Sequence, residues 1–555
     1  MKYGDILLKK KILYNYIQVF ILLFLVSSAF SASFNGFGLK HYTIETEHFR
    51  INYEDGLEEM SRKAGSVLEG LYDIYTNVYN LTLPSKTEVL VINSGYGMAW
   101  ALTIQRTILI DVKGLDYNLR GTNNWLEDAI AHEFAHIVSI WSSFKFPAWM
   151  PYLQIGYFSH PNSIRTIEKK NNDSIQIGAR IEAMHIFPSE ILPPWFFEGI
   201  AQYESLRNNG DKWDTHRDMI LRTLTMSDRL LSWDHMSVFT GKEDDFEKTY
   251  NHGFSLIKYI SETYGHKKIV SILRESSKIG KLNFDKAIKA SLGITGKQLY
   301  KEWRGELKRE YTKQVESIGK QVFGKKINKQ GFDNYWPRFG PDNKIYFLSN
   351  GSHDFAFGFN NLYSYNLSDT VDTNKRIKIE MPSVKSFYNI HEQSRNITFT
   401  SRKSKKSILP PKNGGFRVLD IFIDTLPSEK KKKRLFARKT ERQISEKKWY
   451  YQSVFSPSGE KLAFTQHVKN NFYLLMMDTS GKNIAHLYPP KNNPELQFYT
   501  IFSLDWSPNG NDIAISYIDR DNRKIGIYNI KNKEFHTLCD TEFDERDPRF
   551  SRDGK

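Results

Sequence analysis

A short pattern that recurs in the second half of the sequence constrains the fold more than any other feature. The pattern consists of an aromatic residue, a polar turn rich in Ser, Pro, Gly, Asn or Asp and, where the chain continues, an alternating strand. Copies of it are PRFGPDNKIYFLS, VFSPSGEKLAFTQ, DWSPNGNDIAISY and PRFSRDGK, whose aromatic residues are Phe339, Phe455, Trp506 and Phe550.

The spacing of these copies predicts a β-propeller. The last two intervals are 51 and 44 residues, and the interval of 116 between the first two accommodates one degenerate copy around residues 394–401. A repeat of about 45 residues per four-stranded unit is typical of propeller blades, whereas a β-sandwich would share it only by coincidence. The copies resemble the TolB-type, WD-like repeats of exported bacterial proteins, which implies an all-β propeller over residues 333–555. We count about three complete blades and one begun, which predicts either that the sequence is a fragment or that another partner completes the partial ring.

The first half of the sequence predicts a mixed sheet backed by helices. HYTIETEHFRINYE alternates like a pair of strands, and TEVLVIN and TILIDV are short and β-branched. Residues 56–81 and 125–141 have the apolar spacing of helices. Residues 215–318 are mostly helical, and the stretch 319–332, rich in Lys, Gly and Gln, is expected to be a linker.

The segment AHEFAH lies within the helical pattern of residues 125–141. Residues four apart lie on one face of a helix, so His132 and His136 can bind one metal ion together. Glu133 points to a neighbouring side, where it can take a proton from a metal-bound water. The pattern is that of an HExxH zinc site with two ligands and a general base, and an ordinary amphipathic helix with two histidines is the alternative.

A catalytic zinc ion needs a third protein ligand. The metzincin continuation is excluded, because it needs a glycine where Ser139 stands and a histidine where Ser142 stands. The motif PPWFFEGIAQY resembles instead the W-x-x-E-G-x-A-x-Y element of thermolysin-like and related peptidases of the gluzincin group. This resemblance is specific only at the two short motifs. It implies an α+β zincin-like metallopeptidase domain over residues 32–318, with Glu198 as the third ligand of one Zn²⁺ ion.

The interval between the two motifs is longer than in thermolysin-like enzymes, so residues 141–193 are expected to form an inserted loop near the cleft. The loop holds other candidates for the third ligand, although a rigid helix places a ligand better. These candidates are His160, Glu182, His185 and Glu190. Its aromatic part, residues 141–160, is a candidate for peripheral contact with a membrane or a partner protein, with packing over the cleft as the alternative.

Two polar residues are candidates to hold the histidine rings by hydrogen bonds. Gln202 lies one turn after Glu198, and Asp128 lies one turn before His132. Either residue could equally be a polar side chain at the surface.

The gluzincin resemblance also implies a Tyr or His in the downstream helices that stabilises the oxyanion. The segment KTYNHGFSLIKYISETYG offers Tyr250 and His252, and simple packing at the start of a helix is the alternative for both. A peptide substrate is expected to pair as an added strand with an edge of the sheet, for which residues 108–112 are the candidate.

The first 31 residues predict export. They combine a basic start, an apolar stretch and the small residues of a cleavage site, which is the layout of a secretory signal peptide, with an uncleaved anchor as the alternative. We therefore expect a periplasmic, cell-envelope associated or secreted protein. The single cysteine, Cys539, excludes an intrachain disulfide and does not contradict export. The net charge of +15 is dispersed and matches no nucleic-acid-binding module, so no nucleic acid is expected as a partner.

Two classes of function follow from these features. The leading hypothesis is an exported zinc metallopeptidase that hydrolyses peptide or protein substrates, with Glu133 as general base and the propeller for docking or gating. The alternative is a catalytically inactive, peptidase-like scaffold whose propeller binds a protein partner.

Overall fold

The computed structural model describes residues 41–554 with gaps. The residues outside the description are 1–40, 94–97, 104, 113–119, 122–123, 145–154, 157–182, 185–191, 240–242, 279–280, 282, 321, 329–333, 352–360, 368–376, 382–386, 402–419, 427–440, 446–449, 469–470, 491–497, 499, 520–522, 542 and 555. The expected signal peptide and most of the expected insertion at 141–193, including the aromatic membrane candidate, therefore lie outside the described residues.

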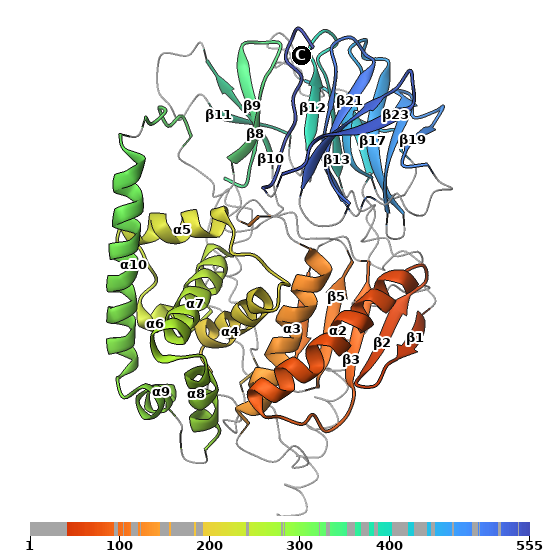
Figure 1. Cartoon of the computed structure of the whole chain (residues 1–555). Coiled ribbons are helices and arrows are strands. Elements are labelled where there is room, and N and C mark those ends of the chain that lie inside the picture. Colours follow the sequence, from red (N-terminus) through yellow and green to blue (C-terminus); the bar gives the residue numbers. More distant parts are fainter. Residues whose placement is uncertain are drawn as a thin grey trace, which may run out of the picture.

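A five-stranded mixed sheet forms the centre of the first half of the chain (Figure 1). Its strands are β1 (His41–Glu45), β2 (Phe49–Glu54), β3 (Thr87–Ile92), β4 (Ala99–Leu102) and β5 (Thr107–Asp111), in the spatial order β1-β2-β3-β5-β4. Strands β2, β3 and β5 run parallel, and β1 and β4 pair antiparallel at the two edges. The prediction of a mixed sheet is confirmed.

The prediction that residues 108–112 provide the edge strand is wrong. Residues 108–111 belong to β5, which pairs with β3 on one side and with β4 on the other. The edge is β4, whose four residues AWAL are too short and too rich in alanine to show a strand pattern in the sequence. Trp100 and Leu102 of this edge strand are 45% and 52% exposed.

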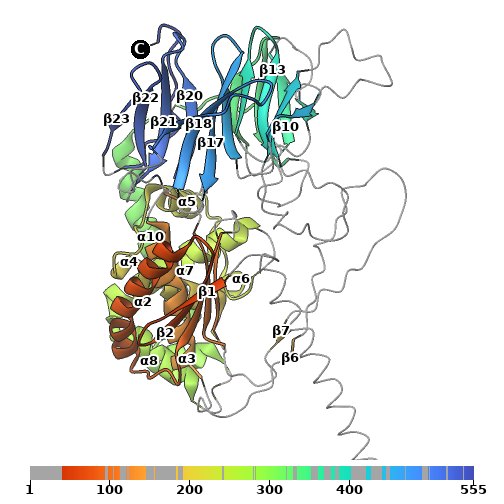
Figure 2. The same cartoon turned by 90° about the vertical axis from the view of Figure 1, so that its right-hand side faces the viewer.

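Helices cover one face of the sheet and continue into a helical layer (Figures 1 and 2). The helices are α2 (Glu58–Tyr79), α3 (Trp125–Ser142), α4 (Pro194–Arg207), α5 (Thr215–Met226), α6 (Trp233–Met236), α7 (Glu243–Tyr264), α8 (Lys267–Ser277), α9 (Phe284–Leu292) and α10 (Gly296–Ile318). Helix α2 packs against β2 and α3, and α3 packs against β4 and β5. Helix α4 lies between α3 and α7 and so joins the sheet half to the helical half. Two short strands, β6 (Ile155–Gly156) and β7 (Ala183–Met184), pair only with each other.

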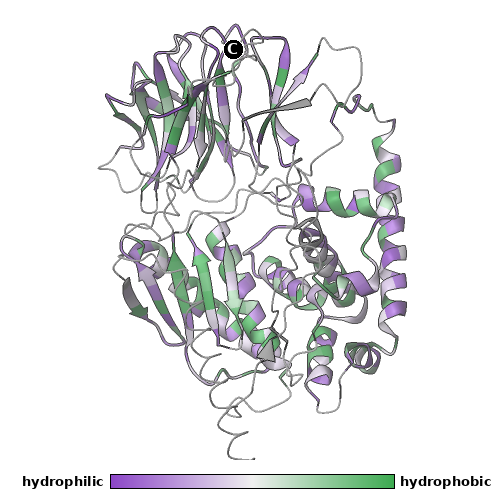
Figure 3. Ribbon diagram, turned by 180° about the vertical axis from the view of Figure 1, so that it is seen from behind, coloured by the Kyte–Doolittle hydropathy of each residue, from purple (hydrophilic) through white to green (hydrophobic). Residues whose placement is uncertain are grey.

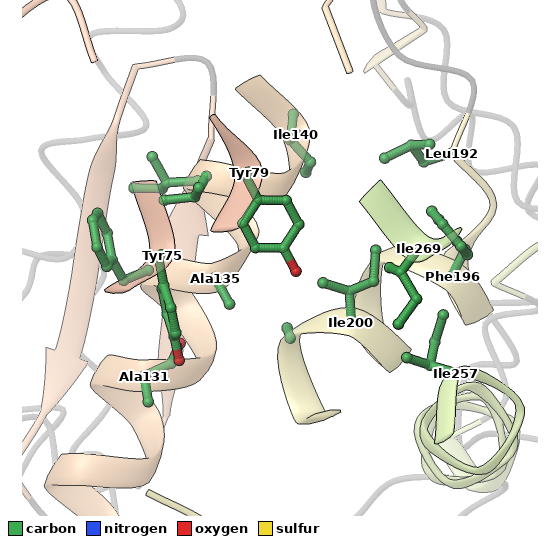
Figure 4. Close-up of a cluster of buried hydrophobic side chains, with 14 of the residues drawn as sticks. Tyr75, Tyr79, Ala131, Ala135, Ile140, Leu192, Phe196, Ile200, Ile257 and Ile269 are labelled. Atoms are coloured by element: carbon green, nitrogen blue, oxygen red, sulfur yellow. The ribbon is translucent and has the colours of Figure 1, made fainter. Parts of the chain in front are cut away.

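One apolar core joins these two halves (Figure 4). Tyr75 and Tyr79 reach into it from α2, and both rings are almost completely buried. Their hydroxyl groups find acceptors inside the core, because an unpaired buried hydroxyl is costly. Tyr75 donates to the carbonyl oxygen of Ala131 at 3.3 Å, and Tyr79 donates to Oε1 of Glu204 at 2.9 Å.

Helices α4 and α7 cross with their backbones in contact. A Cβ atom added to Gly199 would lie 2.5 Å from the carbonyl group of Gly253 and 2.9 Å from the side chain of Ile257. Only glycine fits at this crossing, since real Cβ contacts are longer than 3.0 Å. The glycine after Glu198 therefore fixes how closely the helix of this glutamate lies against α7.

Residues 334–539 form four antiparallel four-stranded sheets that are arranged like the blades of a propeller (Figures 1 and 2). The first sheet holds β8 (Asn334–Phe339), β9 (Lys344–Ser349), β10 (Asn361–Asn366) and β11 (Ile377–Met381), and the second β12 (Tyr388–His391), β13 (Asn396–Ser401), β14 (Asp420–Thr425) and β15 (Arg442–Gln443). The third holds β16 (Tyr450–Phe455), β17 (Lys461–Val468), β18 (Asn471–Asp478) and β19 (Ala485–Tyr488), and the fourth β20 (Thr500–Trp506), β21 (Asp512–Ile518), β22 (Lys524–Asn529) and β23 (Glu534–Cys539). The predicted propeller-like arrangement is confirmed.

The predicted count of three complete blades is wrong, because four complete sheets are present. The degenerate copy accounts for the difference. Its first strand, β12, ends at His391, where the other copies have Phe339, Phe455 or Trp506. The His391 ring still fills the aromatic position: it contacts the ring of Phe455 and its Nε2 lies 3.1 Å from the carbonyl oxygen of Pro457.

Helix α10, which leads to the propeller, shows alternating hydrophilic and hydrophobic residues (Figure 3). Its apolar residues Leu299, Trp303 and Leu307 are buried against the helical layer. Among the helices of the described residues, none has both the length and the hydropathy that a bilayer crossing requires.

Candidate metal site

The two histidines lie on a helix that is buried on nearly all sides. In α3, every residue from Asp128 to Trp141 is buried, which is typical of a helix at the centre of a domain. Glu127 and Asp128 in its first turn place negative charge at the positive end of the helix dipole. Asn124 is the N-cap residue by position, although its side chain makes no capping hydrogen bond.

Glu198 comes from α4, which begins with a proline, as expected for the first position of a helix. The backbone contact at Gly199 places this helix against α7 on one side, and α3 packs on its other side. The glutamate is therefore held on a rigid element that faces the helix of the histidines.

Three side-chain atoms converge between α3 and α4. The Nε2 atoms of His132 and His136 lie 3.1 Å apart, and Oε2 of Glu198 lies 3.3 Å from the first and 3.1 Å from the second. All three residues are buried. This is the set of residues among those described that could hold a metal ion.

The spacing of these atoms fits a small cation. Ligands at about 2.0–2.1 Å from a tetrahedral zinc ion lie about 3.3 Å from one another. Burial lowers the pKa of His132, which favours the neutral imidazole that binds metals. Burial acts to raise the pKa of Glu198, but the charge of His136 and hydrogen bonds from both rings outweigh it and lower the pKa to about 2. The two imidazoles and the carboxylate are thus chemically suited to a metal ion.

Glu133 lies beside these ligands and in contact with the edge strand. Burial raises its pKa to about 8, and the negative charge of Glu198 and Asp128 adds to the increase. The backbone N–H of Ala101 in β4 donates a hydrogen bond to the Glu133 carboxylate and opposes the shift. A carboxyl group whose pKa lies near neutrality can both accept and return a proton.

The structure brings Tyr250, but not His252, to the metal ligands. The Tyr250 ring stacks on the His132 ring with centroids 5.9 Å apart, and the tyrosine lies near enough to the Glu198 carboxylate for that charge to act on it. Burial and the charge of nearby carboxylates raise its pKa well above the ordinary value, so the hydroxyl is protonated at neutral pH. His252 is fully buried on the other side of α7, where its Nε2 accepts a hydrogen bond from the backbone N–H of Leu231.

The two residues that were expected to orient the histidine rings are both buried, and their described hydrogen bonds are to other residues. Asp128 accepts a hydrogen bond from the Ser205 hydroxyl at 2.8 Å. Gln202 donates to a carboxylate oxygen of Asp211, and its own amide oxygen is buried with no hydrogen-bond partner among the described residues. That Gln202 accepts a hydrogen bond from a histidine N–H stays a prediction.

Two functional candidates were missed by the sequence analysis. Arg120, just before α3, pairs with Glu247 at 3.1 Å, and its guanidinium carbon lies 5.2 Å above the centre of the Tyr250 ring. Burial opposes the charge of Arg120, but the contacts with Glu247 outweigh it and hold the pKa above the usual range. Neither residue belongs to a motif, so only the tertiary structure reveals the pair.

The other candidates for the third ligand, His160, Glu182, His185 and Glu190, lie outside the described residues. The choice of Glu198 as the third ligand therefore depends on the distances between its carboxylate and the two imidazoles.

No known protein family matches the sequence, and no curated protein matches it. Among solved structures, the chain is similar to TolB from Acinetobacter baumannii, with 16% identity and a TM-score of 0.29 over 40% of this chain and 47% of that one. It is also similar to an oligogalacturonate lyase from Vibrio parahaemolyticus (10% identity, TM-score 0.26, 39% and 56% covered). A third is a puromycin-hydrolyzing peptidase of Mycobacterium tuberculosis (10% identity, TM-score 0.26, 37% and 31% covered).

The chain thus spans between 31% and 56% of the length of these three structures. They include TolB, the type of propeller that the repeats in the sequence resemble. A similarity this weak carries no information about the metal site.

Proposed function

We propose that the chain is a zinc-dependent metallopeptidase of the gluzincin type, whose peptidase domain spans residues 32–318. The convergence of His132, His136 and Glu198 is the observation that carries this proposal, because three ligand atoms from two helices meet within 3.3 Å beside a buried glutamate. Three protein ligands that leave one position open are typical of catalytic zinc, whereas structural zinc sites use four. Two imidazoles and one carboxylate are a set that suits Zn²⁺ better than Mg²⁺ or Ca²⁺, which prefer oxygen.

When bound, the zinc ion polarises the scissile carbonyl group and lowers the pKa of water and of the neighbouring carboxyl group. Glu133 has the place and the pKa of a general base: it accepts the proton of the attacking water and returns it to the leaving amine. Tyr250 has the place and the protonation state of a hydrogen-bond donor to the oxyanion. The hydrogen bond from Ser205 to Asp128 joins the two helices that carry the proposed ligands.

Strand β4 supplies a binding surface for an extended peptide. It is an edge strand, so one of its sides has no neighbouring strand among the described residues. The hydrogen bond from Ala101 to Glu133 places this strand directly beside the proposed base. A peptide that adds to β4 by main-chain hydrogen bonds would thus run past Glu133, with Trp100 and Leu102 available for side-chain contacts.

The experiment that tests the proposal combines metal content with cleavage. The purified chain is analysed for metals and incubated with an unbiased mixture of peptides. We expect stoichiometric zinc and cleavage that a chelator abolishes. Glu133→Gln should keep the zinc and lose cleavage by a factor of about 10³ or more, since the general base is removed. Glu198→Ala should lose the zinc.

Two outcomes would contradict the proposal. Stoichiometric zinc in Glu198→Ala would show that another residue is the third ligand. Zinc without cleavage of any peptide would favour the inactive scaffold, with the propeller as the surface for a protein partner. Export, and membrane contact through residues 141–160, remain predictions from the sequence.

A further inference from the structure

Arg120 lies between the proposed metal site and the propeller. On the side of the metal site, its guanidinium group makes a two-pronged ion pair with Glu247, with Nε 3.2 and 3.1 Å from the two carboxylate oxygens. The same group lies 5.2 Å above the centre of the Tyr250 ring, a distance at which a cation is attracted to an aromatic face. Glu247 and Tyr250 belong to the same helix, α7, so Arg120 holds this part of the helix and the ring together.

Tyr250 is in turn in contact with the metal ligands. Its ring stacks on His132, and it lies near enough to the Glu198 carboxylate for that charge to act on the tyrosine. The position of the Tyr250 hydroxyl thus depends on Arg120 from one side and on the ligands from the other.

The backbone at Arg120 is held from two directions. Its carbonyl oxygen accepts a hydrogen bond from Nη2 of Arg546 at 3.0 Å, and Arg546 belongs to the segment that follows the fourth propeller sheet. The N–H of the next residue, Gly121, is hydrogen-bonded to the carboxylate of Asp214, the N-cap of α5. A Cβ atom on Gly121 would lie 2.7 Å from Cβ of Asp214, so only glycine allows this approach.

Arg546 is itself fixed to the propeller. Its Nη2 also lies 2.9 Å from the carboxylate of Asp544. The neighbouring residue Glu545 donates its N–H to the carbonyl oxygen of Arg523 and accepts from the Ser516 hydroxyl of β21. The guanidinium group of Arg546 therefore reaches Arg120 from a segment that is tied to the fourth sheet.

We infer that Arg546 and Arg120 are positioning residues, through which the propeller holds Tyr250 against the metal ligands. The fourth propeller sheet is then part of the support of the metal site, in addition to any role in docking. The role of Tyr250 in this inference rests on the proposed function. The contacts with Glu198 and His132, which a metal affinity reports, do not depend on peptide cleavage.

The first test measures zinc affinity by competition with a chromophoric chelator. Groups that contact and orient a metal ligand typically change the affinity 10- to 100-fold when removed. We expect Tyr250→Phe to weaken zinc binding by about 10-fold, and Arg546→Ala, which acts through it, by about 3-fold. Arg546→Lys keeps a donor and should recover most of the loss. Arg549→Ala is the matched control, because Arg549 lies in the same segment but contacts the carbonyl oxygen of Leu504 within the propeller.

The double variant Arg546→Ala/Tyr250→Phe decides between a positioning role and a general structural one. If Arg546 acts through Tyr250, removing Arg546 should have no further effect once the Tyr250 hydroxyl is gone. The double variant should then bind zinc as Tyr250→Phe does, within about 2-fold. Multiplied losses in the double variant, or an Arg546→Ala chain that binds zinc like the wild type, would overturn the inference. An equal loss in Arg549→Ala would do so as well.

A second pair of changes addresses Arg120 without leaving a buried carboxylate unpaired. Arg120→Gln is made together with Glu247→Gln, since loss of the arginine alone would leave an uncompensated charge. The pair should weaken zinc binding by about 10-fold, and adding Tyr250→Phe should not increase the loss. A loss that multiplies with that of Tyr250→Phe would overturn the inference for Arg120.

Kinetic measurements provide an independent test of the inference. For a wild-type chain that cleaves peptides, Arg546→Ala should lower kcat about 3- to 10-fold with KM within about 2-fold, because a misplaced oxyanion donor affects the transition state more than the substrate. A wild-type chain that binds zinc but cleaves nothing would refute the proposed function and leave the zinc affinities to decide the inference. A wild-type chain that binds no zinc would overturn both.

Discussion

The contact between α4 and α7 makes a quantitative prediction for Gly199→Ala. The added Cβ atom would lie 2.5 Å from the backbone carbonyl group of Gly253, whereas ordinary contacts begin at 3.4 Å, so the helices would have to separate by about 0.9 Å. The neighbouring atoms are backbone atoms and cannot rotate away. Overpacking of this kind costs about 1–3 kcal/mol or more, against a gain of about 1 kcal/mol from the higher helix propensity of alanine. Because the contact is with backbone atoms, we place the cost at the upper end, about 3 kcal/mol, and expect a net loss of about 2 kcal/mol in the free energy of unfolding.

Gly70→Ala is the matched control. Gly70 lies in α2 with no atom within 4 Å of the position that a Cβ would take, and it is exposed. The same change should therefore stabilise the chain by about 0.5–1 kcal/mol through helix propensity alone.

Scanning calorimetry with and without zinc measures both effects, because the proposed function predicts that zinc shifts the transition of the half of the chain that holds the proposed ligands. A change of 1 kcal/mol shifts the melting temperature of about 150–250 residues by about 2–4 °C, so Gly199→Ala should melt about 4–8 °C lower and Gly70→Ala slightly higher. Gly199→Ala should also bind zinc more weakly, since Glu198 precedes the displaced residue. A Gly199→Ala chain that melts at or above the wild-type temperature and binds zinc normally would refute the reasoning.

Three other predictions follow from the described contacts. Tyr79→Phe removes the hydroxyl that donates to the fully buried Glu204 and should lower the free energy of unfolding by about 1–3 kcal/mol, measured by calorimetry; no change would show that Glu204 has other sufficient donors. Burial raises the pKa of Asp505 to about 6, so the folded state binds more protons than the unfolded state between about pH 4 and 6, and stability falls as pH rises through this window. The free energy of unfolding of Asp505→Asn should therefore increase relative to that of the wild type, by up to about 3 kcal/mol, as pH rises from 4 to 7. A difference in unfolding midpoint that stays constant over this pH range would contradict this. Trp100→Ala on the exposed edge strand should raise KM for peptides several-fold at unchanged zinc content, and unchanged KM would place the substrate elsewhere.

The parts of the fold that could be predicted are those with a local pattern. The spacing of His132 and His136 is set by one helical turn, and the helix itself is visible in the apolar pattern around it. The start of α4 is marked by its prolines, and the strands β2, β3 and β5 are rich in β-branched residues. These signals were enough to place two of the three ligands on one helix and to propose the third.

The predicted blade count was too low because the degenerate copy around residues 394–401 was not counted as a complete blade. His391 stands where the other copies have an aromatic residue and fills the position through contacts with Phe455 and Pro457. The edge strand β4 was also missed in the sequence. Its four residues have no strand pattern of their own, and their conformation follows from pairing with β5.

The contacts that we infer to support the candidate metal site are the least predictable part, because they join segments with no common motif. The hydrogen bond between Arg546 and Arg120 spans 426 residues of sequence. Its two partners lie in irregular segments, one before α3 and one after the last propeller sheet, where polar residues are common and usually solvated. A ligand set can be recognised from spacing along a helix, since the helix fixes the geometry locally. A positioning contact between two distant segments has no such constraint, so only the folded arrangement distinguishes Arg120 from other arginines near the surface.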